Sequence, residues 1–301
     1  MSKENIYSIA TASILDQATI RQALTWSIAD HVARAKSTGY NGVELWPQGR
    51  KPLSQIKSGE LSQAERNGIT STHQTVAKDL ADAIRTFSLP DIEVSLMMAE
   101  RFKSLDYLEK IRLLVDRDIP VVLFSSAPKD FLETTKYREK GVQTDPALCA
   151  EIGATNAEEF VEAVLEMGFT NVVIDTHHLR RPNIETGGEN PLSDWQKSVP
   201  VLLPYTNEIH VGLGRIDYGG VPRTEIDAEL WDFMNDGRRN TNVVRLLRSI
   251  AGTGWNGLVV LETRPSAIKD VFEQRGFELS ERNLLDSFER IRNTLYQIFG
   301  N

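Results

Sequence analysis

Eight short runs rich in aliphatic and β-branched residues alternate with stretches suited to helices, and this rhythm constrains the fold more than any other feature. The runs are Ile6–Ile14, Gly42–Trp46, Ile69–Val76, Glu93–Met98, Pro120–Ser125, Asn171–Asp175, Glu208–Gly212 and Leu258–Glu262. Strands that alternate with helices form a parallel sheet, and eight such units close into a barrel. The sequence therefore predicts an α/β fold, a (β/α)8 TIM barrel, as one domain over residues 1–301.

The helical stretches carry their own local signals. Ile20–Ser37 has apolar residues at helical spacing and ends near a glycine, and Leu284–Ile298 repeats the same period. Thr155, with Glu158 three residues later, predicts a capped helix start, because a hydroxyl can accept a hydrogen bond from a free backbone amide. These segments are expected on the outside of the barrel.

Three connections that follow predicted strands are long. They are Ser126–Ala154, Leu179–Leu192 and Gly214–Gly237. Long segments in compact domains commonly serve as lids or binding loops, and segments that follow strands lie on the rim where barrel enzymes place their sites. The alternative is that these loops have no role in a site, or that they form contacts between subunits.

Composition limits the partners and the compartment. The net charge is −8, whereas a nucleic-acid binder usually shows a basic face. The charge therefore argues against a nucleic-acid partner. The single cysteine, Cys149, permits no intrachain disulfide, which fits a reducing compartment. The first residues lack the apolar core of a signal peptide, and no run approaches the ~18 apolar residues that span a bilayer. We therefore expect a cytoplasmic protein with no membrane partner.

Three successive predicted strands end in a carboxylate or an imidazole. Asp175 ends the first and is followed by His178, His210 lies on the second, and Glu262 ends the third. The ends of barrel strands converge around one axis, and oxygen and imidazole ligands together suit Mn, Mg, Co or Zn. One divalent metal is therefore expected here. The alternative for each residue is an ordinary hydrogen-bonded polar side chain at a strand end.

Four more residues are candidate substrate contacts. His73 and Glu44 lie on other predicted strands, Trp46 could form an apolar wall for a sugar ring, and Arg215 follows the His210 strand. For His73 and Glu44 the alternative is a supporting or purely structural role, and for Trp46 it is packing. Arg180 and Arg181 could hold an anion, or they could be exposed loop charges.

Taken together, these motifs resemble the xylose isomerase-like TIM-barrel superfamily, which includes sugar phosphate isomerases/epimerases and AP endonuclease family 2. The chain looks like a divergent member. The resemblance rests on Gly39–Trp46, on Asp175-Thr-His-His178 as the D-T-x-H motif, on His210 and on Glu262.

The resemblance implies a reaction beside a carbonyl, through an enediolate, on a sugar or polyol. It implies Asp175, His210 and Glu262 as metal ligands, Glu262 as the catalytic acid or base, and His178 as a substrate contact. A homodimer or tetramer would fit the same family.

The chain departs from the family pattern in two places. A glutamate is expected at the end of the fifth strand, where the sequence places Phe124 or Ser125, with Glu133 or Glu139 as substitutes from the following loop. The family pattern also has an aspartate shortly after the seventh-strand histidine, here His210, and this chain has Leu213 near that place. These departures leave a degenerate barrel that binds a sugar without turnover as an alternative. An endonuclease IV-like repair enzyme is a third hypothesis, although Ser95–Met98 lacks the histidine that such enzymes carry.

Overall fold

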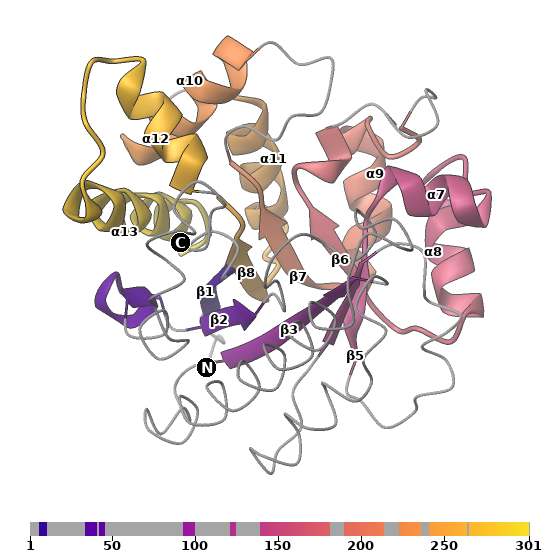
Figure 1. Ribbon diagram of the computed structural model, residues 1–301. Helices are drawn as coiled ribbons and strands as arrows, with labels where there is room; N and C mark the ends of the chain where they lie inside the picture. The colour runs from indigo at the N-terminus through magenta and orange to yellow at the C-terminus, as the bar shows by residue number, and fades with distance from the viewer. Residues whose placement is uncertain are drawn as a thin grey trace, which may run out of the picture.

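The computed structural model describes residues 6–10, 34–40, 42–45, 93–99, 121–124, 139–180, 190–213, 223–235, 241–263 and 265–300. Its strands form one closed parallel barrel in chain order, which confirms the predicted fold class (Figure 1). The strands are β1 (Ile6–Ala10), β2 (Gly42–Leu45), β3 (Glu93–Ala99), β4 (Val121–Phe124), β5 (Glu139–Gln143), β6 (Val172–Asp175), β7 (Thr206–Val211) and β8 (Leu258–Leu261). The barrel closes where β1 pairs with β8, with Ile6 opposite Leu258.

One barrel strand was missed by the sequence prediction. β5 lies inside the segment 126–154 that was expected to be a loop. Its sequence, EKGVQ, begins with two charged residues and contains a glycine, so it lacks the β-branched pattern of a typical strand. Gly141 has a φ of +150°, and a Cβ there would lie 3.0 Å from the Asn171 backbone, so this position requires glycine.

The predicted strand Ile69–Val76 falls outside the described residues. In the closed barrel β2 pairs directly with β3, with Gly42 opposite Glu93. The barrel has eight strands, as expected, but their order differs, because the run Glu93–Met98, expected as the fourth strand, lies in β3. The segment 120–125, expected as the fifth strand, contains the fourth.

Helices cover the outside of the barrel. They are α7 (Pro146–Ile152), α8 (Ala157–Glu166), α9 (Trp195–Leu202), α10 (Arg223–Met234), α11 (Asn242–Ala251), α12 (Pro265–Glu273) and α13 (Glu281–Phe299), with short 3-10 turns at His178–Arg180 and Leu203–Tyr205. Figure 1 shows α7, α8 and α9 beside β5 and β6, and the later helices beside β8 and β1. The segment 284–298 lies within α13 as expected, and residues 34–37 end the helix predicted before Gly39.

The start of α8 differs by one residue from the prediction. Asn156, not Thr155, is the N-cap, and its side chain accepts a hydrogen bond of 2.8 Å from the backbone amide of Glu159. Glu159 Oε2 in turn accepts a hydrogen bond of 2.7 Å from the Thr155 amide. The arrangement resembles a capping box, except that Glu159 binds the amide of the residue before the N-cap and not the amide of the N-cap itself.

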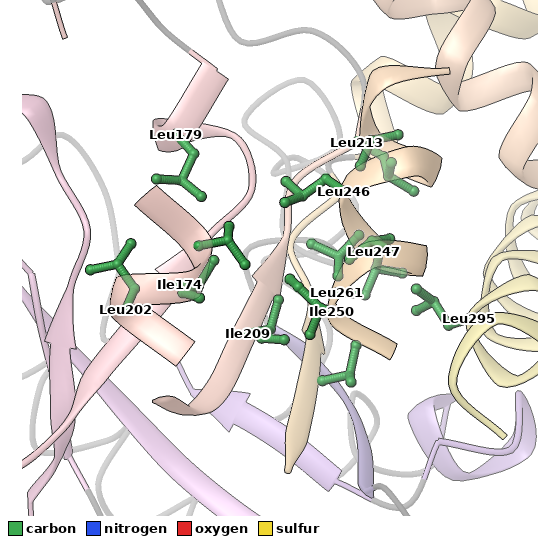
Figure 2. Close-up of a cluster of buried hydrophobic side chains, with 14 of the residues drawn as sticks. Ile174, Leu179, Leu202, Ile209, Leu213, Leu246, Leu247, Ile250, Leu261 and Leu295 are labelled. Carbon is green, nitrogen blue, oxygen red and sulfur yellow. The ribbon is translucent and has the colours of Figure 1, made fainter. Parts of the chain in front are cut away.

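The main hydrophobic core lies between the strands and the outer helices. Figure 2 shows Ile174, Ile209 and Leu261 of three neighbouring strands facing Leu202 of α9 and the side chains Leu246, Leu247 and Ile250 of α11. Side chains alternate between the two faces of a strand. Because Ile174 and Ile209 face the helices, Asp175 and His210 beside them in sequence face the barrel interior. Within the part of the chain described above, no helix has the length and apolarity that crossing a bilayer requires.

Candidate active site

His210 lies at the centre of a buried polar cluster inside the barrel. It follows Glu208 by two residues on β7, so both side chains share the interior face. His210 Nε2 is 2.8 Å from Glu208 Oε1 and 3.2 Å from Glu44 Oε2, and Nδ1 is 2.8 Å from Glu262 Oε1. The side chains of His210, Glu208 and Glu44 have 0% exposure, whereas Glu262 is 10% exposed. Glu262 is therefore the member of the cluster that a ligand can reach most easily.

The charges around His210 favour its protonated form. Burial alone would lower the pKa of its imidazole, because a low-dielectric interior disfavours charge. The carboxylates of Glu44 and Glu262, with the hydrogen bond from Glu208, outweigh burial and raise the pKa well above 6.5. The three acidic residues around His210 therefore favour the imidazolium form of its ring.

Three side chains of this cluster could hold a metal ion. Ligand atoms of Glu44, His210 and Glu262 all lie within 4.8 Å of one another. They come from β2, from β7 and from the position directly after β8, so the closure of the barrel brings them together. Two carboxylates and an imidazole are suitable donors for Mn, Mg, Co or Zn. Glu44, expected as a substrate contact, lies directly against His210.

Asp175 lies beside this cluster, at the end of β6. Its Oδ1 accepts hydrogen bonds from the backbone amides of His177 at 2.6 Å and His178 at 3.0 Å, which closes the turn after the strand. Its Oδ2 accepts a short hydrogen bond from Nε2 of Gln143. Asp175 therefore organises the turn that carries His178.

His178 is held between two acidic side chains. Its Nδ1 lies 3.4 Å from Asp145 Oδ2, and its Nε2 lies 3.5 Å from Asp175 Oδ2. Burial by itself would lower the pKa of His178, but Asp175, then Asp145 and finally Glu262 raise the pKa to about 9. The side chain is 11% exposed, whereas that of His210 is fully buried.

Three residues of the site were not among the sequence predictions. Gln143 is the last residue of β5, and Asp145 follows it by two residues. Because this segment was expected to be a loop, nothing in the sequence indicated that either residue lies at a strand end. Glu208 was the first residue of a predicted strand, and its spacing of two from His210 was the signal that could have placed both on one face.

The fifth strand of the barrel ends at Gln143, and not at Phe124 or Ser125 as expected from the sequence. Phe124 ends β4, not the fifth strand, and Ser125 and Glu133 are outside the described residues. The fifth strand begins at Glu139 and ends at Gln143, so an amide stands where the family resemblance predicts a carboxylate.

Several of the predicted contacts lie outside the described residues or are described by backbone alone. His73, Trp46, Arg215 and Arg181 lie outside the described residues, and Arg180 is described by its backbone only. Parts of two long rim segments, residues 181–189 and 214–222, are also outside.

No protein-family model and no curated protein matches the sequence. A proposed sugar phosphate isomerase/epimerase from Anabaena variabilis has a similar structure, with 11% identity, a TM-score of 0.50 and coverage of 98% of this chain and 100% of that one. A xylose isomerase-like TIM barrel/4-hydroxyphenylpyruvate dioxygenase fusion protein has 10% identity and a TM-score of 0.48, covering 93% of this chain and 46% of that one. The tryptophan synthase alpha chain of Legionella pneumophila has 11% identity and a TM-score of 0.47, covering 99% and 92%. At these identities the similarity shows the barrel fold alone.

Proposed function

We propose that this barrel is a divalent-metal-dependent enzyme that acts on a sugar or polyol beside a carbonyl, as an isomerase, an epimerase or a related dehydratase. The observation that carries the proposal is the convergence of Glu44, His210 and Glu262 within 4.8 Å inside the barrel. The residues present fit a metal, because they offer carboxylate oxygens and an imidazole nitrogen in a buried place.

His210 and Glu262, both expected as ligands, would hold the ion together with Glu44, and Asp175 borders them through Gln143. A divalent cation supplies Lewis-acid polarisation of a carbonyl oxygen. Proton transfer and hydrogen bonding to the substrate would be carried out by the side chains that a substrate can reach.

Two such side chains have complementary roles in this proposal. Glu262 would move a proton at the carbon next to the carbonyl, because its carboxylate is 10% exposed whereas its cluster partners are fully buried. His178 would donate a hydrogen bond to an oxygen that gains negative charge, since its raised pKa of about 9 keeps it protonated at neutral pH.

The test is uptake of solvent deuterium into ketoses, aldoses and inososes incubated with the metal-loaded protein. Glu262→Gln keeps the size of the side chain but removes the base, so exchange should fall at least about 100-fold. Glu273→Gln, an exposed change on α12, serves as the matched control. Equal exchange by Glu262→Gln and the native protein would overturn the proposal.

A second candidate is a barrel that binds a sugar without turning it over. Gln143 motivates it, because an amide at the end of β5 cannot act as the second base that the family resemblance implies. Calorimetric binding of a polyol with no deuterium exchange would support this candidate and would reject the enzyme.

A further inference from the structure

We infer that a cation in this barrel is held by Glu44, His210 and Glu262, and that Gln143 withdraws Asp175 from the ligand set and makes it a positioning residue for the turn that carries His178. The inference rests on the proposed metal-dependent function and departs from the ligand set that the sequence resemblance implies. Two independent contacts support it, one on each side of His210.

The first contact occupies Asp175. Both backbone amides of the following turn bind its Oδ1, and the Gln143 amide nitrogen binds its Oδ2. A carboxylate only accepts hydrogen bonds, so the amide must present its N–H groups to Asp175 and its carbonyl oxygen elsewhere. A cation at Oδ2 would have to displace a donor that already satisfies this oxygen, whereas Glu44 and Glu262 each place a carboxylate within 3.2 Å of a ring nitrogen of His210.

The second contact orients His210. Glu208 Oε1 lies 2.8 Å from Nε2, and both side chains are fully buried. Histidine ligands of metals commonly donate one ring N–H to a carboxylate, and Glu208 is placed to accept it. Glu44 Oε2 lies 3.2 Å from the same nitrogen and Glu262 Oε1 lies 2.8 Å from Nδ1, so one carboxylate of the proposed ligand set stands at each edge of the ring.

Gln143 also provides an acceptor that the described protein does not use. Its side chain is 1% exposed, and its Oε1 has no hydrogen-bond partner among the described residues. Its Nε2 lies 3.4 Å from His210 Nδ1, so the amide group that carries this acceptor borders the cation cluster. Buried acceptors are rarely left unmatched in native proteins, which points to a bound water, hydroxyl or ion at this place.

The decisive experiment compares Mn²⁺ and Co²⁺ affinity in the metal-stripped full chain, measured by calorimetry, for Glu44→Gln and Asp175→Asn. We expect Glu44→Gln to weaken binding at least about 10-fold and Asp175→Asn to change it less than about threefold. Asn at 175 can still accept the backbone hydrogen bonds, and its amide can pair with a rotated Gln143, so the fold should persist. Circular dichroism would verify this.

The opposite ranking would overturn the inference. If Asp175→Asn abolishes binding while Glu44→Gln retains it, the centre uses Asp175 and the proposed metal-dependent function still stands. If the native chain binds neither Mn²⁺, Co²⁺, Mg²⁺ nor Zn²⁺, both the inference and the metal-dependent function are wrong.

Gln143→Glu gives an independent test that does not need loss of binding. In the metal-free protein it places a second carboxylate against Asp175, so Tm should fall by at least about 3 °C. Added Mn²⁺ should then raise Tm more than it does in the native protein, because the new pair can bind a cation. Gln196→Glu, at an exposed site on α9, is the matched control. An unchanged Tm in metal-free Gln143→Glu would contradict the contact between Gln143 and Asp175, on which the inference depends.

Discussion

Glu208 and His210 lie two residues apart on the interior face of β7, and a hydrogen bond of 2.8 Å joins Glu208 Oε1 to His210 Nε2. Both side chains have 0% exposure. The pair is local in sequence, but its burial depends on the other strands of the barrel. Buried charged partners are costly to separate, because removing one charge leaves the other less compensated.

We therefore predict that Glu208→Gln destabilises the protein. The amide can still accept a hydrogen bond from His210, but the charge that supports the imidazolium is lost, so the free energy of unfolding should fall by about 1–3 kcal/mol. Urea unfolding at neutral pH measures the change. Glu289→Gln, the same replacement at an exposed position of α13, should have little effect. Equal stability of the two variants would contradict the prediction.

The raised pKa of His178 predicts a loss of stability at alkaline pH in the metal-free protein. A folded-state pKa of about 9 lies above the ordinary value of 6.5. The contribution is complete below pH 6.5 and disappears as pH rises through about 9, and the shift corresponds to roughly 3 kcal/mol. Urea unfolding at pH 6 and at pH 9.5 measures it.

His210 titrates in the same sense, because its pKa is also raised, so a variant is needed to isolate His178. His178→Asn should reduce the fall in stability between the two pH values, and Asp145→Asn should reduce it by less. An unchanged pH dependence in His178→Asn would show that the contacts with Asp145 and Asp175 do not hold its proton.

Gly212 should not tolerate a side chain. It follows β7, and a Cβ at this position would lie 2.6 Å from Cβ of His177, in the turn that Asp175 organises. We predict that Gly212→Ala lowers the free energy of unfolding by about 1–3 kcal/mol, because this close contact forces the backbone apart. Thermal unfolding tests this. Gly252→Ala, at the end of α11 where φ is −62°, should change stability by less than about 1 kcal/mol.

Cys149 should be unreactive in the folded protein. Its side chain is fully buried, and burial, followed by the charge of Asp145, raises the pKa of its thiol to about 12. Because the thiolate is the reactive form, labelling by a disulfide reagent at pH 8 should be slow. The reaction should become fast in urea, and one thiol per chain should then be counted. Rapid labelling of the native protein would contradict the packing of α7.

The sequence by itself determined the fold class. Runs such as residues 172–174 and Leu258–Leu261 are continuous and apolar, as strands buried on both faces must be. The same local pattern predicted Asp175, His210 and Glu262 as polar residues at strand ends, because a polar residue after such a run is visible without knowledge of its neighbours. Their proposed roles as metal ligands remain predictions.

Only the tertiary structure decided which polar groups meet. The segment EKGVQ has weak strand propensity, and it becomes β5 because β4 and β6 pair with it on either side. That pairing introduces Gln143 and Asp145 into the site, and closure of the barrel brings Glu44 of β2 to 3.2 Å from His210 of β7. Strand propensity and side-chain alternation are local properties that a sequence displays directly. Register and closure depend on hydrogen bonds between distant segments, and those contacts decide the composition of the site.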